Sequence, residues 1–552
     1  MSVKTAPGPL PARSQKTARN AFVALFVLLL MIVVRTFRDY GITWDEDIQS
    51  RYGETLLRWY GTLGRDDTAA HFGNLYLYGG LFETLAEGVA RFFPQSHFEI
   101  RHLVGALFGA LAFPAAYGAG TRLGGPQAGL MSAILLALNP LFYGHLFANS
   151  KDSPFAASFM VALYFILDSV KHLDATGGPK LLRLGLAIGV SAGIRVWGLA
   201  LLGCLALLWG AFLLLSVRAA PPDASLGGKA KRAARSFLFV TVIAWGTMLG
   251  AWPWASLSPL TGPLRALFAT ATLRPDITFL FSGQMVSASA LPSDYAFTWF
   301  LITLPECHLL GLGLALLLGV AWLRSKRTGD WRAAAGDALP ALWFSLVALA
   351  PLALVWLARP FLYDGVRHLL FLIPPLCVIA GVGFSALLRG PFGKGVKVLA
   401  ALGGLAAGLV TVTDMVSLHP YQTVYFNRVF AGGLPEAAER YETDYWGSSY
   451  KEGVEWLTRN YPPPSRRPVR LALVGASRQL TYYLERLDHG NRFEVREPDP
   501  DPHVLLITRN RNRFRRIKGT LLHTIDRQGT PLLFIFEIRK PRAAESAERP
   551  SG

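Results

Sequence analysis

The sequence predicts a multi-pass α-helical membrane protein with about eleven spans and a small C-terminal α/β domain. Of its 552 residues, 52% are hydrophobic and only 17% are charged, and the mean hydropathy is +0.32. The apolar runs are long enough, with their flanks, to cross a hydrocarbon core. Lys and Arg, which give a formal net charge of +18, gather between these runs. This distribution is typical of membrane topology and does not indicate a nucleic-acid-binding surface.

The N-terminal tail, residues 1–20, is basic and precedes the first apolar run at residues 21–34. A basic flank before a hydrophobic segment predicts that the chain begins in the cytoplasm and emerges on the far side of the membrane. Residues 35–38 lack the small side chains of a cleavage site, so we expect this run to remain as an anchor.

The first outer loop, residues 38–100, carries Asp45 and Glu46 in an exposed position close to the membrane. A carboxylate held there can act as a base on a group presented from the aqueous side. A solvated loop is the alternative interpretation of the pair. Behind it, apolar residues at helical spacing predict amphipathic helices on the membrane surface. These residues are Ile48, Tyr52, Leu56, Leu57, Tyr60, Leu75, Leu77, Leu81, Phe82 and Leu85.

A tight second outer loop follows two spans, near residues 101–120 and 128–147, and contains Lys151 and Asp152. Capping of the next span, at residues 154–168, is by itself enough to explain the aspartate. The loop nevertheless places a cation and another carboxylate on the same side of the membrane as the first loop. That coincidence indicates a functional site more strongly than either motif alone.

The apolar stretch 181–217 is too long for one span, and we expect a break at Arg195. The break places this arginine on the outer face, against the positive-inside tendency. Its guanidinium fork is suited to a phosphate there. Snorkelling to lipid headgroups is an equally weighted alternative.

A late span opens on the outer side with Arg367 and His368, and the last span leaves the C-terminus outside. For the histidine alone, a helix-end position satisfied by backbone or water is the favoured interpretation. The spans expected in this part of the chain are 237–254, 297–323, 338–357, the one that begins at 366, and 398–412.

From residue 417 the composition becomes polar and aromatic, which predicts an extracytoplasmic α/β domain over residues 417–540 and a disordered tail over 541–552. A basic run at 509–518 is typical of a solvated face or a contact with lipid headgroups. The expected elements are strands at 469–474, 504–507 and 532–538 and a helix at 450–459.

An ordered set of short motifs marks the membrane region: Thr-Trp-Asp-Glu at 43–46, Lys-Asp-Ser-Pro-Phe at 151–155 and Arg-His at 367–368, followed by an outer domain. With this set, residues 21–412 resemble the GT-C membrane glycosyltransferases, and within them the protein O-mannosyltransferase and lipid A aminoarabinose transferase group. The resemblance implies a GT-C-like catalytic domain at 21–416. It also implies transfer of a sugar, with inversion, from a polyprenyl-phosphate carrier to a hydroxyl of a glycan, lipid or protein. The reaction would take place on the outer face of a bacterial cytoplasmic membrane.

The carboxylates fit this chemistry, because an acceptor hydroxyl is a poor nucleophile until a base removes its proton. We expect Asp45 to be the base, with Glu46 as its rival and Asp152 orienting the acceptor or a cation. Some GT-C enzymes need a divalent metal. These three carboxylates could hold one, but without further ligands they do not decide the matter.

The basic residues of the outer loops are the expected ligands of the donor phosphate, whose departure fixed cations stabilise. They are Lys151, Arg195, Arg367 and the neighbouring His368.

Two other classes of protein also have many spans. A transporter or flippase of a lipid-linked substrate would explain arginines near the membrane, but it favours internal repeats, which the sequence does not show. A non-catalytic scaffold that displays the C-terminal domain leaves the charged outer-loop motifs without a purpose. Glycosyl transfer is therefore the favoured prediction.

Overall fold

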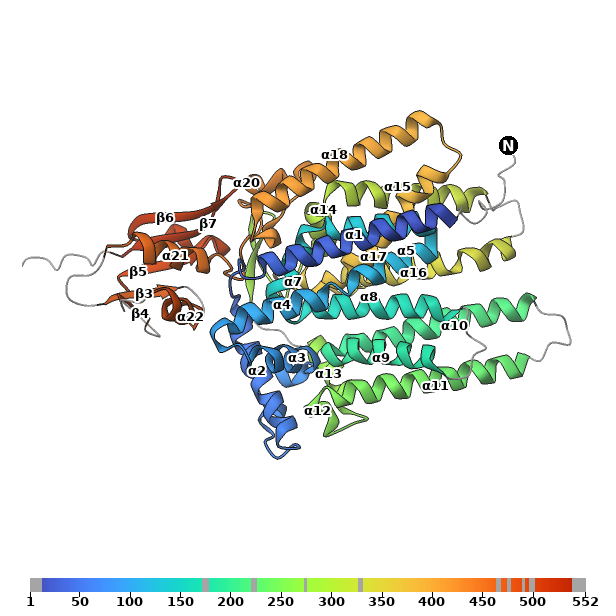
Figure 1. Ribbon diagram of the computed structural model, residues 1–552, viewed down its shortest axis with the longest axis horizontal. Coiled ribbons are helices and arrows are strands. Elements are labelled where there is room, and N and C mark those ends of the chain that lie inside the picture. The colour runs from blue at the N-terminus through green and yellow to red at the C-terminus, as the bar shows by residue number, and fades with distance from the viewer. Residues whose placement is uncertain are drawn as a thin grey trace, which may run out of the picture.

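The computed structural model describes residues 12–170, 178–219, 226–272, 276–325, 331–462, 468–473, 478–488, 492–495 and 502–538. Long helices run side by side in a bundle, and a small domain containing a β-sheet lies at one end of it (Figure 1). The helices α2 and α3 lie at this same end, whereas α1 begins at the other end (Figure 1). The tail predicted at 541–552 and the first part of the tail at 1–20 fall outside the described residues.

Eight helices among the described residues are long and apolar enough to cross a membrane, or nine segments if the bent pair α6 and α7 is one span. The helices α8 (Asp152–Ser169) and α9 (Pro179–Ile194) run beside them in the bundle. A multi-pass helical architecture is therefore confirmed, and the number of eleven spans stays a prediction. The eight are α1 (Ala12–Thr36), α4 with α5 (His97–Gly109, Ala112–Gly124), η5 with α10 (Val196–Leu199, Ala200–Ala219), α11 (Leu226–Gly250), α15 (Glu306–Ser325), α16 (Trp331–Ala358), η6 with α17 (Arg367–Leu372, Ile373–Arg389) and α18 (Lys394–Leu418).

The span expected at 128–147 is a bent pair of helices, α6 (Pro126–Ala137) and α7 (Pro140–Ala148), whose axes differ by 63°. Asn139 begins the second helix by accepting a hydrogen bond from the Phe142 N–H at 2.8 Å. The proline that follows needs no donor at the first helical position. These local signals end one helix and begin another where we expected a continuous span.

The sequence also predicted one continuous span, at 297–323, and one break within an apolar stretch, at Arg195, and these two predictions have opposite outcomes. The span expected at 297–323 is wrong, because α14 (Tyr295–Thr303) ends before Pro305 and α15 begins after it. The residue before a proline is disfavoured in the helical region, which favours a break there. The break expected at Arg195 is confirmed, since this residue has an extended backbone between α9 and η5.

Helices are present at both apolar stripes expected between residues 38 and 100, but Leu75 and Leu77 of the second stripe lie in the separate η2 and not in α3. Most residues of the two stripes pack into the protein. Tyr52 and Leu56 of α2 are fully buried in a cluster with Ala69 and Leu75. Phe82 of α3 belongs to the main core. The exposed members of the stripes are Ile48, Tyr60 and Leu85. The elements of this loop are α2 (Trp44–Gly61), η1 (Thr68–Ala70), η2 (Leu75–Leu77), α3 (Leu81–Ala90) and η3 (Pro94–Ser96).

A buried ionic network attaches these helices to α4. Arg101 of α4 forms ion pairs with Glu83 and with Glu87 of α3, the latter at 2.8 Å. The hydroxyl of Ser50, in α2, donates to Glu87 at 2.9 Å. All four side chains are buried, so each charge depends on its partners inside the protein.

Replacing Arg101 with alanine is expected to destabilise the protein by about 3–5 kcal/mol, because two buried carboxylates would lose their cation. The midpoint of thermal unfolding in detergent measures this change. Arg58→Ala is the matched control: Arg58 lies 3.6 Å from Asp66 in a partly exposed pair, which contributes little. An Arg101→Ala protein that unfolds at the wild-type temperature would contradict a structural role for the network.

Smaller elements connect the long helices. Residues 282–283 form the turn of an antiparallel hairpin, β1 with β2, and the Gly283 N–H donates to the Arg440 carbonyl at 2.9 Å. The hairpin is thereby attached to the segment that leads into the C-terminal domain. The connecting elements are α12 (Pro253–Ser256), α13 (Gly262–Thr272), β1 (Thr278–Phe281), β2 (Gln284–Ser287), η7 (Gln422–Val424), α19 (Arg428–Ala431) and α20 (Gly433–Ala437).

The C-terminal domain has a five-stranded sheet in the order β4-β3-β5-β7-β6. The first three strands are parallel, and β7 pairs antiparallel with both of its neighbours. The three predicted strands and the predicted helix are confirmed with small shifts at their ends, whereas β4, β6 and α22 were not expected. The elements are α21 (Tyr450–Asn460), β3 (Val469–Leu473), α22 (Arg478–Leu487), β4 (Phe493–Val495), β5 (Val504–Thr508), η8 (Asn510–Arg516), β6 (Thr520–Arg527) and β7 (Thr530–Glu537).

The C-terminal domain packs directly against the start of the first outer loop. The Ile42 N–H donates to the hydroxyl of Tyr483, in α22, at 2.6 Å. A Cβ atom at Gly41 would lie only 2.0 Å from the Ser448 carbonyl oxygen. Only glycine allows the two segments to approach this closely, so the chain just before α2 is held against the domain.

Candidate active site

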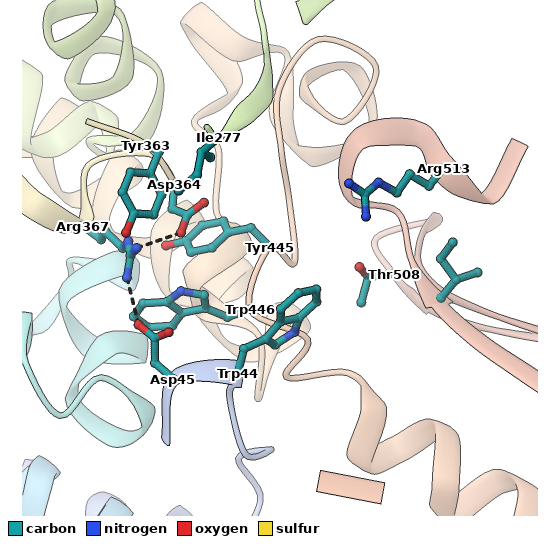
Figure 2. A pocket seen from close by; sticks show the side chains of 11 residues that line it. Trp44, Asp45, Ile277, Tyr363, Asp364, Arg367, Tyr445, Trp446, Thr508 and Arg513 are labelled. Carbon is teal, nitrogen blue, oxygen red and sulfur yellow. Dashed lines mark hydrogen bonds and ion pairs between the residues drawn. The ribbon is translucent and has the colours of Figure 1, made fainter. Parts of the chain in front are cut away.

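A cavity lies between the start of α2 and the C-terminal domain (Figure 2). Its volume is about 250 Å³, slightly below the roughly 300–1,000 Å³ usual for small-molecule sites. Five separate parts of the chain contribute to its walls. The lining residues are Trp44, Asp45, Ile277, Tyr363, Asp364, Arg367, Tyr445, Trp446, Ile507, Thr508 and Arg513.

Asp45 lies in the first turn of α2 and turns its carboxylate toward two cations. The Lys151 ammonium lies 3.2 Å from Oδ2, and the Arg367 guanidinium lies 3.3 Å from the same oxygen. Burial alone would raise the pKa of this carboxyl, but the two cations outweigh it and hold the pKa well below its ordinary value. The side chain is 35% exposed, so a ligand in the cavity can reach it.

Arg367 begins η6 and is held on several sides. Its guanidinium lies 3.0 Å from the Asp364 carboxylate and stacks over the rings of Tyr363 and Trp446, at 4.5 and 5.1 Å from their centroids. Figure 2 shows it between the two carboxylates. A buried cation fixed by planar contacts is already oriented for a bidentate anion.

Lys151 lies in the turn between α7 and α8 and is half-buried. Its ammonium lies over the Tyr78 ring at 5.7 Å. Burial alone would lower the pKa of this lysine, but the charge of Asp45 outweighs that effect, and the pKa is raised. Lys151 is therefore a fixed positive charge beside the carboxylate.

Asp152 and Arg195 form a second ion pair next to the first. The Arg195 guanidinium lies over the same Tyr78 ring as Lys151, at 5.7 Å. Asp152 was expected to cap the helix that follows it, but it is the first residue of α8 and makes no cap. Its carboxylate instead accepts a hydrogen bond from the Asn149 amide at 3.2 Å. Neither member of this pair lines the cavity.

Glu46 is buried, contrary to the exposed position that we expected, and it does not line the cavity. Its carboxylate accepts a hydrogen bond from the Thr43 N–H at 2.6 Å and completes a capping box at the start of α2. The other oxygen lies 2.8 Å from Nε2 of His102. With both oxygens used, Glu46 positions the helix that carries Asp45.

His368 follows Arg367 but does not line the cavity. Its ring makes an edge contact with Tyr363, at 4.8 Å between centroids. It supports the aromatic ring on which the neighbouring arginine stacks.

The three carboxylates that we considered as metal ligands are not gathered around one point. Asp45 pairs with cations, Glu46 caps a helix and Asp152 pairs with Arg195. Among the residues that the structure describes, no group of three or more His, Cys, Asp or Glu side chains could hold a metal ion. These residues do not fit a divalent cation, and we derive no step through one.

Sequence reasoning missed the aromatic wall of the cavity. Tyr445 and Trp446 lie in a stretch for which the sequence indicated only an aromatic and polar composition. The backbone N–H of Trp44 donates to the Trp446 carbonyl at 3.2 Å. Gly447 has a φ of +73°, and a Cβ there would lie 2.3 Å from the indole nitrogen of Trp44. A tryptophan followed by glycine was the available signal of close packing. Asp364 and Arg513 were also missed as lining residues.

No protein-family model matches the chain, and no curated protein matches it. Among solved structures, it is similar to an oligosaccharyltransferase of Archaeoglobus fulgidus, with a TM-score of 0.45 and 11% identity over 86% of this chain. It is also similar to the arabinosyltransferase EmbB of Mycobacterium smegmatis, with a TM-score of 0.37 and 16% identity over 78% of this chain. A third is the protein O-mannosyltransferase complex of S. cerevisiae, with a TM-score of 0.32 and 15% identity over 50%.

The chain spans 64%, 44% and 39% of the lengths of these three chains. They are GT-C fold glycosyltransferases, the group that the sequence resembles. All three TM-scores are below 0.5, and no conclusion about this chain is drawn from the likeness. The reaction proposed below rests on the geometry of the cavity.

Proposed function

We propose that this protein is a membrane glycosyltransferase that moves a sugar from a polyprenyl-phosphate carrier to an acceptor hydroxyl. The observation that carries the proposal is that Asp45 and Arg367 line one cavity, while Lys151, which does not line it, pairs with Asp45 from a second side. The C-terminal domain, which supplies part of the cavity wall, lies at one end of the bundle. A carboxylate beside two fixed cations supplies both functions that this transfer needs: a base for the acceptor and a partner for the leaving phosphate.

The proposed step is one displacement. The acceptor oxygen attacks the anomeric carbon, and its proton passes to the Asp45 carboxylate. The bond between the anomeric carbon and the phosphate oxygen breaks, and its electron pair stays on the departing polyprenyl phosphate. Lys151 and Arg367 balance that charge. The anomeric centre is inverted because the acceptor attacks opposite the leaving group.

The ion pairs of the free protein suit a base that becomes active when the donor binds. A general base works best with a pKa near the operating pH, yet the two cations hold the pKa of Asp45 well below its ordinary value. A donor phosphate would compete for the same cations. A phosphate bound beside Lys151 and Arg367 would offset their charge, so the pKa of Asp45 would rise and its carboxylate would accept a proton more readily.

We place the reaction on the outer face of a bacterial cytoplasmic membrane. The basic residues Arg13, Lys16 and Arg19, which lie at the start of α1 before its apolar run, favour a cytoplasmic N-terminus. The C-terminal domain lies at the opposite end of the bundle from the start of α1 (Figure 1), and it supplies part of the cavity wall. In this orientation the polyprenyl chain stays in the membrane, and its phosphate-linked sugar enters the cavity. Arg195 and Asp152 then support Lys151 from behind, through Tyr78.

Binding of the lipid phosphate tests the proposal independently of the acceptor. A polyprenyl-phosphate sugar at 100 times its Kd is expected to stabilise the protein by about 2.7 kcal/mol. Thermal unfolding in lipid nanodiscs measures this, with polyprenol of the same chain length as the control that lacks the phosphate. Equal stabilisation by polyprenol would show that the chain binds the lipid tail alone, against the proposed site.

A further inference from the structure

The far wall of the cavity, formed by the C-terminal domain, bears a cation that the proposed reaction does not use. Figure 2 shows Arg513 and Thr508 across the cavity from Asp45 and Arg367. Arg513 lies in η8 and is exposed. Within the described part of the chain, the structure gives it neither an ion pair nor a hydrogen bond.

The neighbouring arginines whose side chains the structure describes, Arg509 just before η8 and Arg515 and Arg516 within it, differ from Arg513. Arg509 and Arg515 both pair with Glu439, the latter at 2.9 Å. Arg516 is exposed like Arg513 but does not line the cavity. Among the side chains of this segment that the structure describes, Arg513 is therefore the cation that lines the cavity and has no ion pair.

The charges on the two sides of the cavity are unequal for this reason. On the side of the bundle, Asp45 and Asp364 are matched by two cations, Arg367 and Lys151. On the side of the C-terminal domain, the residues that line the cavity are Ile507, Thr508 and Arg513, so the formal charge there is positive. An uncompensated guanidinium at the wall of a cavity favours an anionic ligand group.

Between these two sides lie the aromatic rings of Trp44, Tyr445 and Trp446. Amphipathic rings of this kind pack against the apolar faces of a ligand while their polar atoms bond to its edges. The indole N–H of Trp44 has no hydrogen-bond partner among the described residues. A sugar ring presents apolar C–H faces and a rim of hydroxyl oxygens, which suits this wall.

We infer that the acceptor is an acidic carbohydrate, whose carboxylate or phosphate group is bound by Arg513 while its sugar ring packs against the aromatic wall near Asp45. The inference rests on the proposed function, because it assigns the acceptor to the side of the cavity that the donor phosphate does not occupy. Arg367 and Lys151 bind the donor, and Arg513 selects the acceptor. The donor and the acceptor are thus bound by different cations.

Three matched probes test the inference on the full chain in nanodiscs: a neutral β-linked disaccharide, the same disaccharide with a terminal hexuronate, and the same disaccharide with a 6-phosphate. Saturation-transfer NMR titrations give their dissociation constants. A charge-assisted hydrogen bond predicts that an acidic probe binds about tenfold more tightly than the neutral one. Tighter binding of the hexuronate probe would identify the acidic group as a carboxylate, and tighter binding of the 6-phosphate probe would identify it as a phosphate.

Two variants locate the effect. Arg513→Ala is expected to abolish the preference for the acidic probe, and Arg516→Ala, the exposed neighbour outside the cavity, is expected to keep it. Absence of a preference in the wild type, or its equal loss in both variants, would overturn the inference. So would Arg513-dependent binding of an acidic serine peptide that is tighter than that of every disaccharide. Stabilisation by the polyprenyl-phosphate sugar is a separate measurement, so failure of the proposed donor is distinguishable from failure of the proposed acceptor.

Discussion

Replacing Asp45 with asparagine is expected to slow sugar transfer by about 10²–10⁴-fold, because the amide keeps the shape of the side chain but accepts no proton. The donor should bind at least as tightly as in the wild type. Its phosphate would no longer compete with the Asp45 carboxylate for Lys151 and Arg367. The initial rate of sugar transfer and the stabilisation by donor, measured on the same preparation, separate these two effects.

Asp47→Asn is the matched control, since Asp47 lies in the same turn of α2 but pairs with Arg51 and Arg478, at 2.9 and 3.1 Å, and does not line the cavity. It should keep its activity. Glu46→Gln should mainly lower the temperature of unfolding, because Glu46 caps α2. Normal turnover in Asp45→Asn would end its assignment as the base.

The ion pairs of Asp45 also predict how the stability of the folded protein depends on acid pH. Its pKa is lowered in the folded protein, so it contributes stability that is fully present above its ordinary pKa of about 3.9. That contribution is lost as the pH falls from there toward the lowered folded value. Asp45→Asn should therefore have a shallower loss of stability in this range than the wild type.

Replacing Arg367 with alanine is expected to weaken donor binding by about 10–100-fold, the usual effect of losing hydrogen bonds to a charged group. It also leaves Asp45 and Asp364 without their shared cation, so the free protein should unfold at a lower temperature. Arg367→Lys should restore part of the affinity, since a lysine keeps the charge but loses the planar fork. Titration with a polyprenyl-phosphate sugar measures each variant.

Arg195→Ala provides the comparison for this effect. Arg195 is half-buried and pairs with Asp152 outside the cavity, so its loss should weaken donor binding less than the loss of Arg367. If both variants bind the donor as the wild type does, neither arginine belongs to the donor site.

Charge bias and apolar length predicted much of the fold, because both are local properties of the sequence. The break at Arg195, the helices of the first outer loop and three strands of the C-terminal domain followed from periodicity and from the limits on span length. Strand β4 has only three residues, and β6 includes His523 and Asp526, so neither shows an apolar run.

The cavity itself was only partly predictable. Topology placed Asp45, Lys151 and Arg367 on one side of the membrane, but it gave no contacts between residues as distant in sequence as Asp45 and Arg367. The role of Glu46 was readable in principle, since threonine followed three residues later by glutamate is the capping-box pattern. The pairing of Asp152 with Arg195 and the position of Arg513 depend on tertiary packing, for which the sequence contains no local signal.

The most direct test is to incubate the reconstituted wild type and Asp45→Asn with a polyprenyl-phosphate sugar and a membrane extract that supplies acceptors. Mass spectrometry then counts the polyprenyl phosphate released. A flippase would bind the same lipid but leave its glycosidic bond intact. We expect steady release by the wild type and bound, intact donor in Asp45→Asn. Intact donor with both proteins, or equal release by both, would contradict glycosyl transfer with Asp45 as the base.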